Sequence, residues 1–197
     1  MNLPNKLSCF RMVLVLLIVA TWIFPYAQFN ITIPEFEIGI VVLSLKNILV
    51  LTLFCIASIT DFLDGYIARK NNLITSFGKF IDPIADKLLV NTMFIMFACM
   101  GIVPIVPVLV MIWRDTIVDG LRMSTASKGV VVAAGMLGKV KTVAQMITII
   151  LVLLNNLPFE LLRFPMADFM LWFSMLVSVA SGFSYFMQMK EHVLETM

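Results

Sequence analysis

Apolar residues occur along this chain in long runs that few charged residues interrupt, and short polar segments separate the runs. A helix of about 20 apolar residues is needed to cross a hydrocarbon core about 30 Å thick. Six runs meet this length, at 11–29, 39–66, 79–100, 104–122, 139–157 and 166–189. Exposed strands alternate apolar and polar residues, whereas these runs are continuous. The pattern therefore predicts an all-α integral membrane protein with six transmembrane helices.

Composition supports this prediction and excludes other classes. Of 197 residues, 61% are hydrophobic and 13% are charged, against about 45–50% and 25% in soluble domains. Intrinsic disorder requires the opposite balance, with low hydrophobicity and high net charge. A formal net charge of +2 is too small to indicate a nucleic-acid partner. We expect a single membrane domain covering residues 1–197.

Lysine and arginine lie at alternate ends of the predicted spans. Most of them lie before the first span, in the connections between spans two and three and between spans four and five, and after the sixth span. These residues are Lys6, Arg11, Arg69, Lys70, Lys79, Arg122, Lys128, Lys139 and Lys190. The opposite connections carry Arg163 as their basic residue. Because positive charge concentrates in cytoplasmic loops, this bias predicts that both termini lie in the cytoplasm.

Four of the 12 acidic residues lie in one short region, at Asp61, Asp64, Asp82 and Asp86. The spacings i,i+3 and i,i+4 place each pair on one helical face, and a hairpin of successive spans would bring the pairs together. Four carboxylates at a membrane edge need compensating cations. Oxygen donors suit Mg²⁺, Mn²⁺ or Ca²⁺. The alternative, pairing with nearby Lys or Arg, does not explain the small residues and the arginine at fixed offsets between them.

The complete pattern is D-x2-D-G-x2-A-R-x8-G-x3-D-x3-D, from Asp61 to Asp86. It resembles the signature of the CDP-alcohol phosphatidyltransferase family. The resemblance implies that Asp61, Asp64 and Asp82 bind two divalent cations, Mg²⁺ or Mn²⁺. It implies that Asp86 lies at the metal ions and acts as a general base. In that family an acceptor hydroxyl attacks the diphosphate phosphorus next to the lipid, and CMP leaves.

The resemblance also implies a binding surface for the donor, CDP-diacylglycerol. The implied positions are Asp61, Gly65, Ala68, Arg69 and Gly78. Asn5, in the Pro-Asn pair before the first span, has two interpretations: it contacts the nucleotide, or it caps a helix. The family is often dimeric, so a homodimer is an open expectation.

A second set of residues bears on the acceptor alcohol. The segments 112–115 and 138–146 resemble the branch of the family that uses sn-glycerol 3-phosphate, with Asp115 where that branch usually has Glu. Basic residues suited to binding its phosphate are Arg114, Arg122, Lys139 and Lys141. The alternative is ordinary flanking charge at span ends.

Other functions are compatible with parts of this pattern. Another acceptor, such as phosphatidylglycerol, serine or an inositol phosphate, would use the same chemistry. A cation transporter would also place carboxylates in spans, near the middle of the bilayer. The resemblance implies a bacterial plasma membrane, with the active site on the cytoplasmic side.

Overall fold

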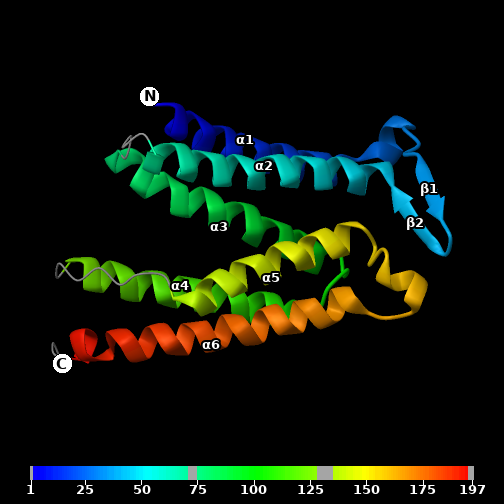
Figure 1. Cartoon of the computed structure of the whole chain (residues 1–197). Coiled ribbons are helices and arrows are strands. Elements are labelled where there is room, and N and C mark those ends of the chain that lie inside the picture. Colours follow the sequence, from blue (N-terminus) through cyan, green and yellow to red (C-terminus); the bar gives the residue numbers. More distant parts are fainter. Residues whose placement is uncertain (1, 71–74, 128–134, 195–197) are drawn as a thin grey trace. The chain divides into compact units, whose positions relative to one another are not determined.

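The structure is a computed structural model that describes residues 2–70, 75–127 and 135–194. The described part contains six α-helices: α1 (Leu3–Ile23), α2 (Leu45–Lys70), α3 (Ser76–Cys99), α4 (Ile105–Ser127), α5 (Met136–Leu153) and α6 (Met166–Leu194) (Figure 1). Two short 3-10 helices, η1 (Tyr26–Phe29) and η2 (Phe159–Leu162), lie in the connections. Each predicted span overlaps one α-helix, which confirms a mostly helical fold.

Four of these helices are long and apolar enough to cross a membrane. The qualifying segments are Pro4–Ile23, Leu45–Ile67, Met136–Leu153 and Met166–Lys190. The chain therefore has the character of an integral membrane protein. The prediction of six spans and the orientation of the termini both stay predictions.

The first helix is displaced from its predicted range of 11–29. It begins at Leu3, because Pro4 in the first turn needs no hydrogen-bond acceptor for its nitrogen. It ends at Ile23, and Phe24 leaves the helical region with φ −53° and ψ 129°. That conformation is expected before a proline, since the ring of Pro25 crowds a helical predecessor.

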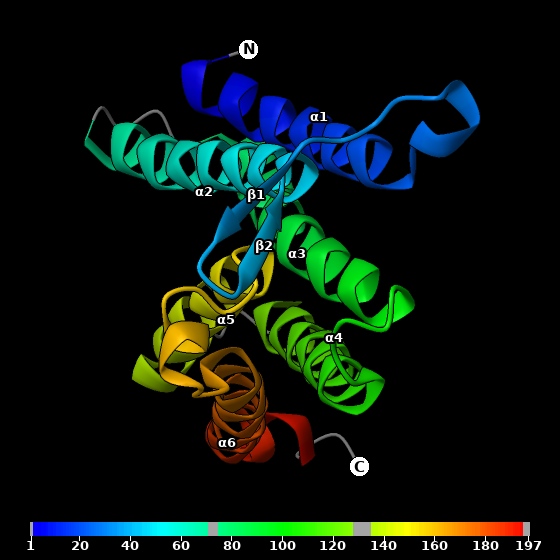
Figure 2. The same cartoon turned by 90° about the vertical axis from the view of Figure 1, so that its right-hand side faces the viewer.

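Residues 35–44 form a β-hairpin, which the interpretation of residues 39–66 as one apolar span did not anticipate. Strand β1 (Glu35–Ile38) pairs antiparallel with β2 (Val41–Ser44), next to the beginning of α2 (Figure 2). Residues 35–38 alternate polar and apolar side chains, which is the period of a strand. Gly39 takes a φ of +65° in the tight turn, a conformation favoured by glycine. Helix α2 therefore begins at Leu45 and not at residue 39.

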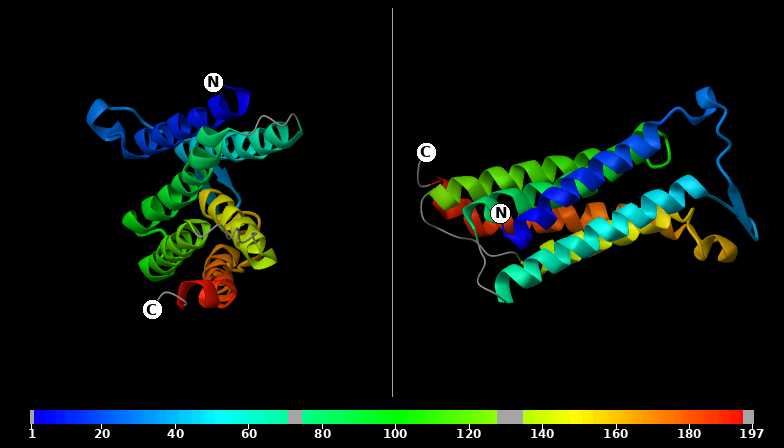
Figure 3. Two further views of the ribbon diagram at one scale, coloured as in Figure 1. Left: turned by 90° about the vertical axis from the view of Figure 1, so that its left-hand side faces the viewer. Right: turned by 90° about the horizontal axis from the view of Figure 1, so that it is seen from above.

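The helices belong to two compact units, which we describe separately. The first unit comprises Met1–Met96 and Ile150–Phe164. Helix α1 packs along α2, and the hairpin lies where α1 ends and α2 begins (Figure 3). The side chains of Ile18 and Phe54 are buried in this unit. The Asn155 amide donates a hydrogen bond to the Val42 carbonyl (2.6 Å), which ties the connection after α5 to the hairpin.

The second unit comprises Phe97–Ile149 and Pro165–Met197. Helix α4 packs along α6, with Val118, Tyr185 and Met189 forming a buried cluster. The hydroxyls of Thr148 on α5 and Ser174 on α6 lie 3.1 Å apart and join those two helices. The unit therefore holds polar contacts inside an otherwise apolar helix packing.

Candidate active site

A buried arginine joins the first two carboxylates of the signature pattern. Arg11 on α1 is fully buried. Its Nη1 lies 2.5 Å from Asp61 Oδ1, and its Nη2 lies 2.5 Å from Asp64 Oδ2. Asp61 and Asp64 share a face of α2 by their i,i+3 spacing. One guanidinium therefore holds both carboxylates, each by a single oxygen.

Ser8 connects the same face of α1 to helix α3. It precedes Arg11 by three positions, so the two side chains project from one side of α1. The Ser8 hydroxyl lies 2.6 Å from Asp82 Oδ1 and 3.4 Å from Asp64 Oδ2. The structure thus gathers Asp61, Asp64 and Asp82 around one face of α1. Asp86 lies one turn further along α3 and is half-buried.

We tested whether this cluster fits the divalent cations that the resemblance implies. Within the described ranges, no three Asp, Glu, His or Cys side chains are arranged as ligands of one ion. Arg11 instead pairs with two of the carboxylates. The donor chemistry does fit, because three carboxylates outnumber one guanidinium and supply only oxygen donors, which hard cations prefer. The chemistry of the side chains, and not their present arrangement, supports a metal centre.

Asn5 and Gly78, two predicted donor-binding positions, meet at the same end of the first unit. Asn5 is buried inside α1, so the helix-cap interpretation is wrong, and Asn2 precedes the helix instead. Thr75 Oγ1 lies 3.0 Å from Asn5 Oδ1 and accepts a hydrogen bond from the Gly78 amide. A Cβ at position 78 would lie 2.9 Å from Asn5 Oδ1. Glycine at position 78 therefore leaves room for the buried side chain of Asn5.

The remaining predicted donor-binding positions lie along α2. Gly65 follows Asp64 and is half-buried. Ala68 and Arg69 belong to the last turns of the same helix, and their side chains lie outside the described part of the structure. Their roles stay predictions.

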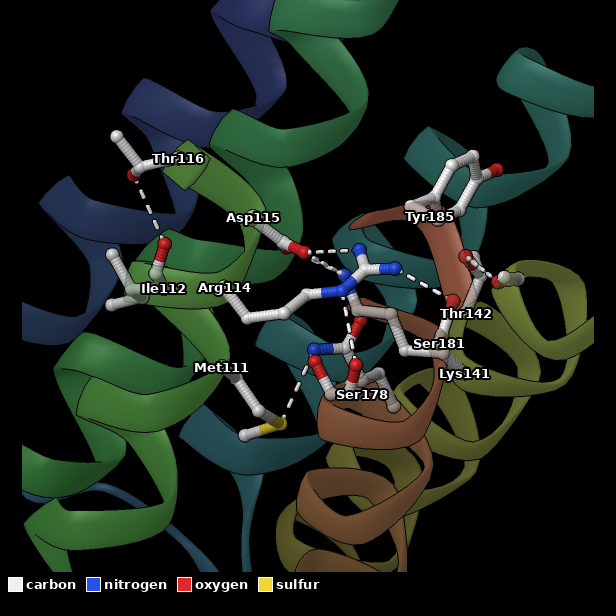
Figure 4. Close-up of polar contacts among 12 residues, drawn as sticks. Met111, Ile112, Arg114, Asp115, Thr116, Lys141, Thr142, Ser178, Ser181 and Tyr185 are labelled. Atoms are coloured by element: carbon white, nitrogen blue, oxygen red, sulfur yellow. Dashed lines mark hydrogen bonds and ion pairs between the residues drawn. The ribbon is translucent and has the colours of Figure 1, made fainter. Parts of the chain in front are cut away.

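In the second unit, two of the four predicted phosphate-binding cations share one carboxylate. Lys141 Nζ lies 2.5 Å from both oxygens of Asp115, and both residues are buried (Figure 4). Arg114 Nη1 donates to the same Asp115 Oδ1 at 2.9 Å. Asp115, noted in the sequence only as a departure from Glu, is therefore the centre of a buried ion cluster.

Helix α6 supplies the other contacts of Arg114. Its Nε donates to the Ser178 carbonyl at 3.0 Å, and its Nη2 donates to Ser181 Oγ at 2.6 Å (Figure 4). The guanidinium carbons of Arg114 and Arg122 each lie 5.6 Å from the centre of the Tyr185 ring. Cation–π attraction at such distances favours both positions. The structure thus brings Arg114, Arg122 and Lys141 into one cluster.

Lys139, the fourth predicted cation, is exposed at the beginning of α5. It lines an open groove of about 280 Å³ whose other walls are apolar residues of α5 and α6. Lys139 is therefore accessible to an anion.

Sequence reasoning missed Ser8 and Arg11 as site residues. Arg11 was counted only among the flanking charges, although it is fully buried. A cation followed at once by an apolar run, with a serine three positions earlier, is a signal that could have identified this face. Ser181 and Tyr185 carry no comparable local signal, because their partners lie on other helices.

Comparison with known proteins agrees with the signature. The family model for CDP-alcohol phosphatidyltransferase matches residues 1–180. A Bacillus subtilis protein named CDP-diacylglycerol–glycerol-3-phosphate 3-phosphatidyltransferase is 44% identical over 185 residues, covering 94% of this chain and 93% of its own length. A Rickettsia bellii protein of the same name is 37% identical over 192 residues, covering 97% of both chains. The chain belongs to the CDP-alcohol phosphatidyltransferase family, and it is a phosphatidyltransferase of phospholipid biosynthesis.

Proposed function

We propose that this enzyme transfers the phosphatidyl group of CDP-diacylglycerol to sn-glycerol 3-phosphate, giving phosphatidylglycerophosphate and CMP. The observation that carries the proposal is the clustering of the signature carboxylates Asp61, Asp64 and Asp82 on the Ser8–Arg11 face. The names of the relatives from Bacillus subtilis and Rickettsia bellii support the acceptor. The transporter alternative has no corresponding support.

The first unit would bind the donor and carry out proton transfer. The residues that would hold two cations, Mg²⁺ or Mn²⁺, are Asp61, Asp64, Asp82 and Asp86. Bound there, the cations would neutralise the diphosphate and polarise its phosphorus. The donor would lie on the surface formed by Asn5, Asp61, Gly65, Ala68, Arg69 and Gly78.

Asp86 accepts the proton of the acceptor hydroxyl while that oxygen bonds to the phosphorus next to the lipid. The bond from this phosphorus to the CMP oxygen breaks, and CMP leaves.

The second unit would bind the acceptor through its phosphate. Arg114, Arg122, Lys139 and Lys141 supply the positive charge, and a guanidinium can contact two phosphate oxygens together. Asp115 partly balances Arg114 and Lys141. Lys139 and Arg122 are exposed, so an entering phosphate can reach both side chains.

We expect Lys139→Ala to raise the KM for glycerol 3-phosphate about three- to tenfold, because an exposed charge contributes modestly to anion binding. The KM for CDP-diacylglycerol should stay unchanged. CMP release by purified protein in detergent measures both values. Lys190→Ala, at the end of α6, is the matched control and should match the wild type. An equal rise in both KM values would contradict a role of Lys139 in binding the acceptor phosphate.

The acceptor itself is tested by supplying candidates one at a time. Purified protein with Mg²⁺ or Mn²⁺ and CDP-diacylglycerol should release CMP when glycerol 3-phosphate is added. Serine, inositol phosphate and phosphatidylglycerol should give no release above background. Release with one of these, and none with glycerol 3-phosphate, would overturn the proposed acceptor.

We also propose that the enzyme resides in a bacterial plasma membrane with both termini and the active site on the cytoplasmic side. The distribution of lysine and arginine between the connections supports this orientation. Reporter fusions at each terminus would test it, and a reporter that is active on the outer side would contradict it.

A further inference from the structure

The side chain of Arg114 crosses one face of α6, and four residues of that face make room for it or contact it. Ser178, Ser181, Gly182 and Tyr185 follow the spacing i, i+3, i+4 and i+7, so they lie on one side of the helix. Ser178 contacts Arg114 through its carbonyl, Ser181 through its hydroxyl, and Tyr185 through its ring. We call these four residues the α6 cradle.

Gly182 is the position in the cradle where space is critical. A Cβ at this residue would lie 2.9 Å from Arg114 Cγ and 3.3 Å from its Nε. Cγ lies in the middle of the side chain and Nε belongs to the guanidinium itself, so an added methyl group would have to displace the guanidinium. The absence of a side chain at Gly182 is therefore what allows Arg114 to lie against α6.

The cradle leaves Arg114 able to bind an anion. A guanidinium carries five N–H donors, and the described residues accept from three of them, through Ser178, Ser181 and Asp115. The side chain retains 12% of its exposure. Arg114, Lys141 and Asp115 together carry one more positive than negative charge. A group that only anchored α6 to α4 would need neither this excess charge nor remaining donors.

We propose that Ser181 and Gly182 are positioning residues for the acceptor: they hold the Arg114 guanidinium in the orientation that receives the phosphate of glycerol 3-phosphate. This inference rests on the proposed function and adds to it the element that orients the phosphate-binding arginine. The orientation of a binding group strongly affects transfer reactions, because a displacement of about 1 Å can lower the reaction rate by a factor of about 100.

The test is Gly182→Ala in the full-length enzyme, purified in detergent. The KM for glycerol 3-phosphate should rise by a factor of about 10 to 100, because a displaced guanidinium loses charge-assisted hydrogen bonds to the phosphate, while the KM for CDP-diacylglycerol stays within about twofold of the wild type. Gly120→Ala on α4 is the matched control, because a Cβ there meets nothing within 4 Å. This control should leave both KM values unchanged.

A second variant covers the case in which Gly182→Ala does not fold. Ser181→Ala removes the acceptor of Arg114 Nη2 without adding volume, and it should raise the same KM about three- to tenfold. Ser184→Ala on the same helix is its control. As a second readout, glycerol 3-phosphate should raise the apparent Tm of the wild type and should do so less in both cradle variants.

The outcomes separate this inference from the proposed function. If the wild type releases no CMP with glycerol 3-phosphate, the proposed function fails. If the wild type does release CMP but the cradle variants keep its KM for glycerol 3-phosphate, only the positioning role fails. A lower Tm with unchanged KM and kcat would show that the cradle is merely structural, and would also overturn the inference.

Discussion

Replacing Asp86 by asparagine is expected to reduce turnover by a factor of about 100 to 10,000, the usual contribution of a general base. Asparagine has nearly the same shape as aspartate but cannot accept the proton of the acceptor hydroxyl. Binding of CDP-diacylglycerol should remain close to that of the wild type. CMP release measures turnover, and the rise in apparent Tm on adding CDP-diacylglycerol measures binding.

Two further measurements distinguish proton transfer by Asp86 from other effects of removing a carboxylate. Asp168→Asn, at an exposed position in the first turn of α6, is the matched control and should turn over normally. Excess Mn²⁺ should not restore Asp86→Asn if the missing function is proton transfer. Recovery of turnover at high Mn²⁺ would indicate that Asp86 acts only as a metal ligand. Normal CMP release by Asp86→Asn in the absence of excess Mn²⁺ would refute its role as the general base.

Replacing Arg11 by methionine is expected to have the largest effect on stability. Methionine fills a similar space but leaves Asp61 and the buried Asp64 without their shared cation. Loss of one partner from a buried ion pair costs about 3–5 kcal/mol, because the remaining charge stays buried without compensation. The apparent Tm in detergent should fall accordingly. Lys6→Met, at an exposed position on the same helix, should change it little.

The Arg11 variant also provides a test of the metal centre that does not depend on activity. If a divalent cation can neutralise these carboxylates, excess Mn²⁺ should raise the Tm of Arg11→Met more than that of the wild type. EDTA should abolish this difference. Equal stability of Arg11→Met and Lys6→Met would show that the Arg11 ion pairs do not stabilise the fold, and no response to Mn²⁺ would count against the metal site.

Helix number could be predicted from the sequence, but several helix ends could not. Continuous apolar runs are a strong and local signal, and each one corresponds to a helix in the structure. The hairpin was missed because β2 (Val41–Ser44) is itself apolar and merges with the run that becomes α2. The turn at Gly39 separates the two, and a single glycine is a weak signal beside a long apolar run.

Candidate chemistry was most easily predicted where its residues lie close together in the sequence. The four aspartates of the signature fall within 26 residues, so their spacing alone identified them. Arg11 lies 53 positions from Asp64, and Ser8 lies 74 positions from Asp82. Ser181 similarly lies 67 positions from Arg114. No local pattern relates residues so far apart.

By itself, the sequence determined that this chain is a helical membrane protein with a phosphatidyltransferase signature, because long apolar runs and closely spaced carboxylates depend only on neighbouring residues. Only the tertiary structure determined which positively charged side chains pair with the buried carboxylates. Arg11 reaches Asp61 and Asp64 because α1 packs along α2, and Lys141 meets Asp115 because α5 lies within reach of α4. A buried charge needs a partner, and here Arg11 and Lys141 each lie on another helix than the carboxylate they pair with, at least 26 positions away in the sequence.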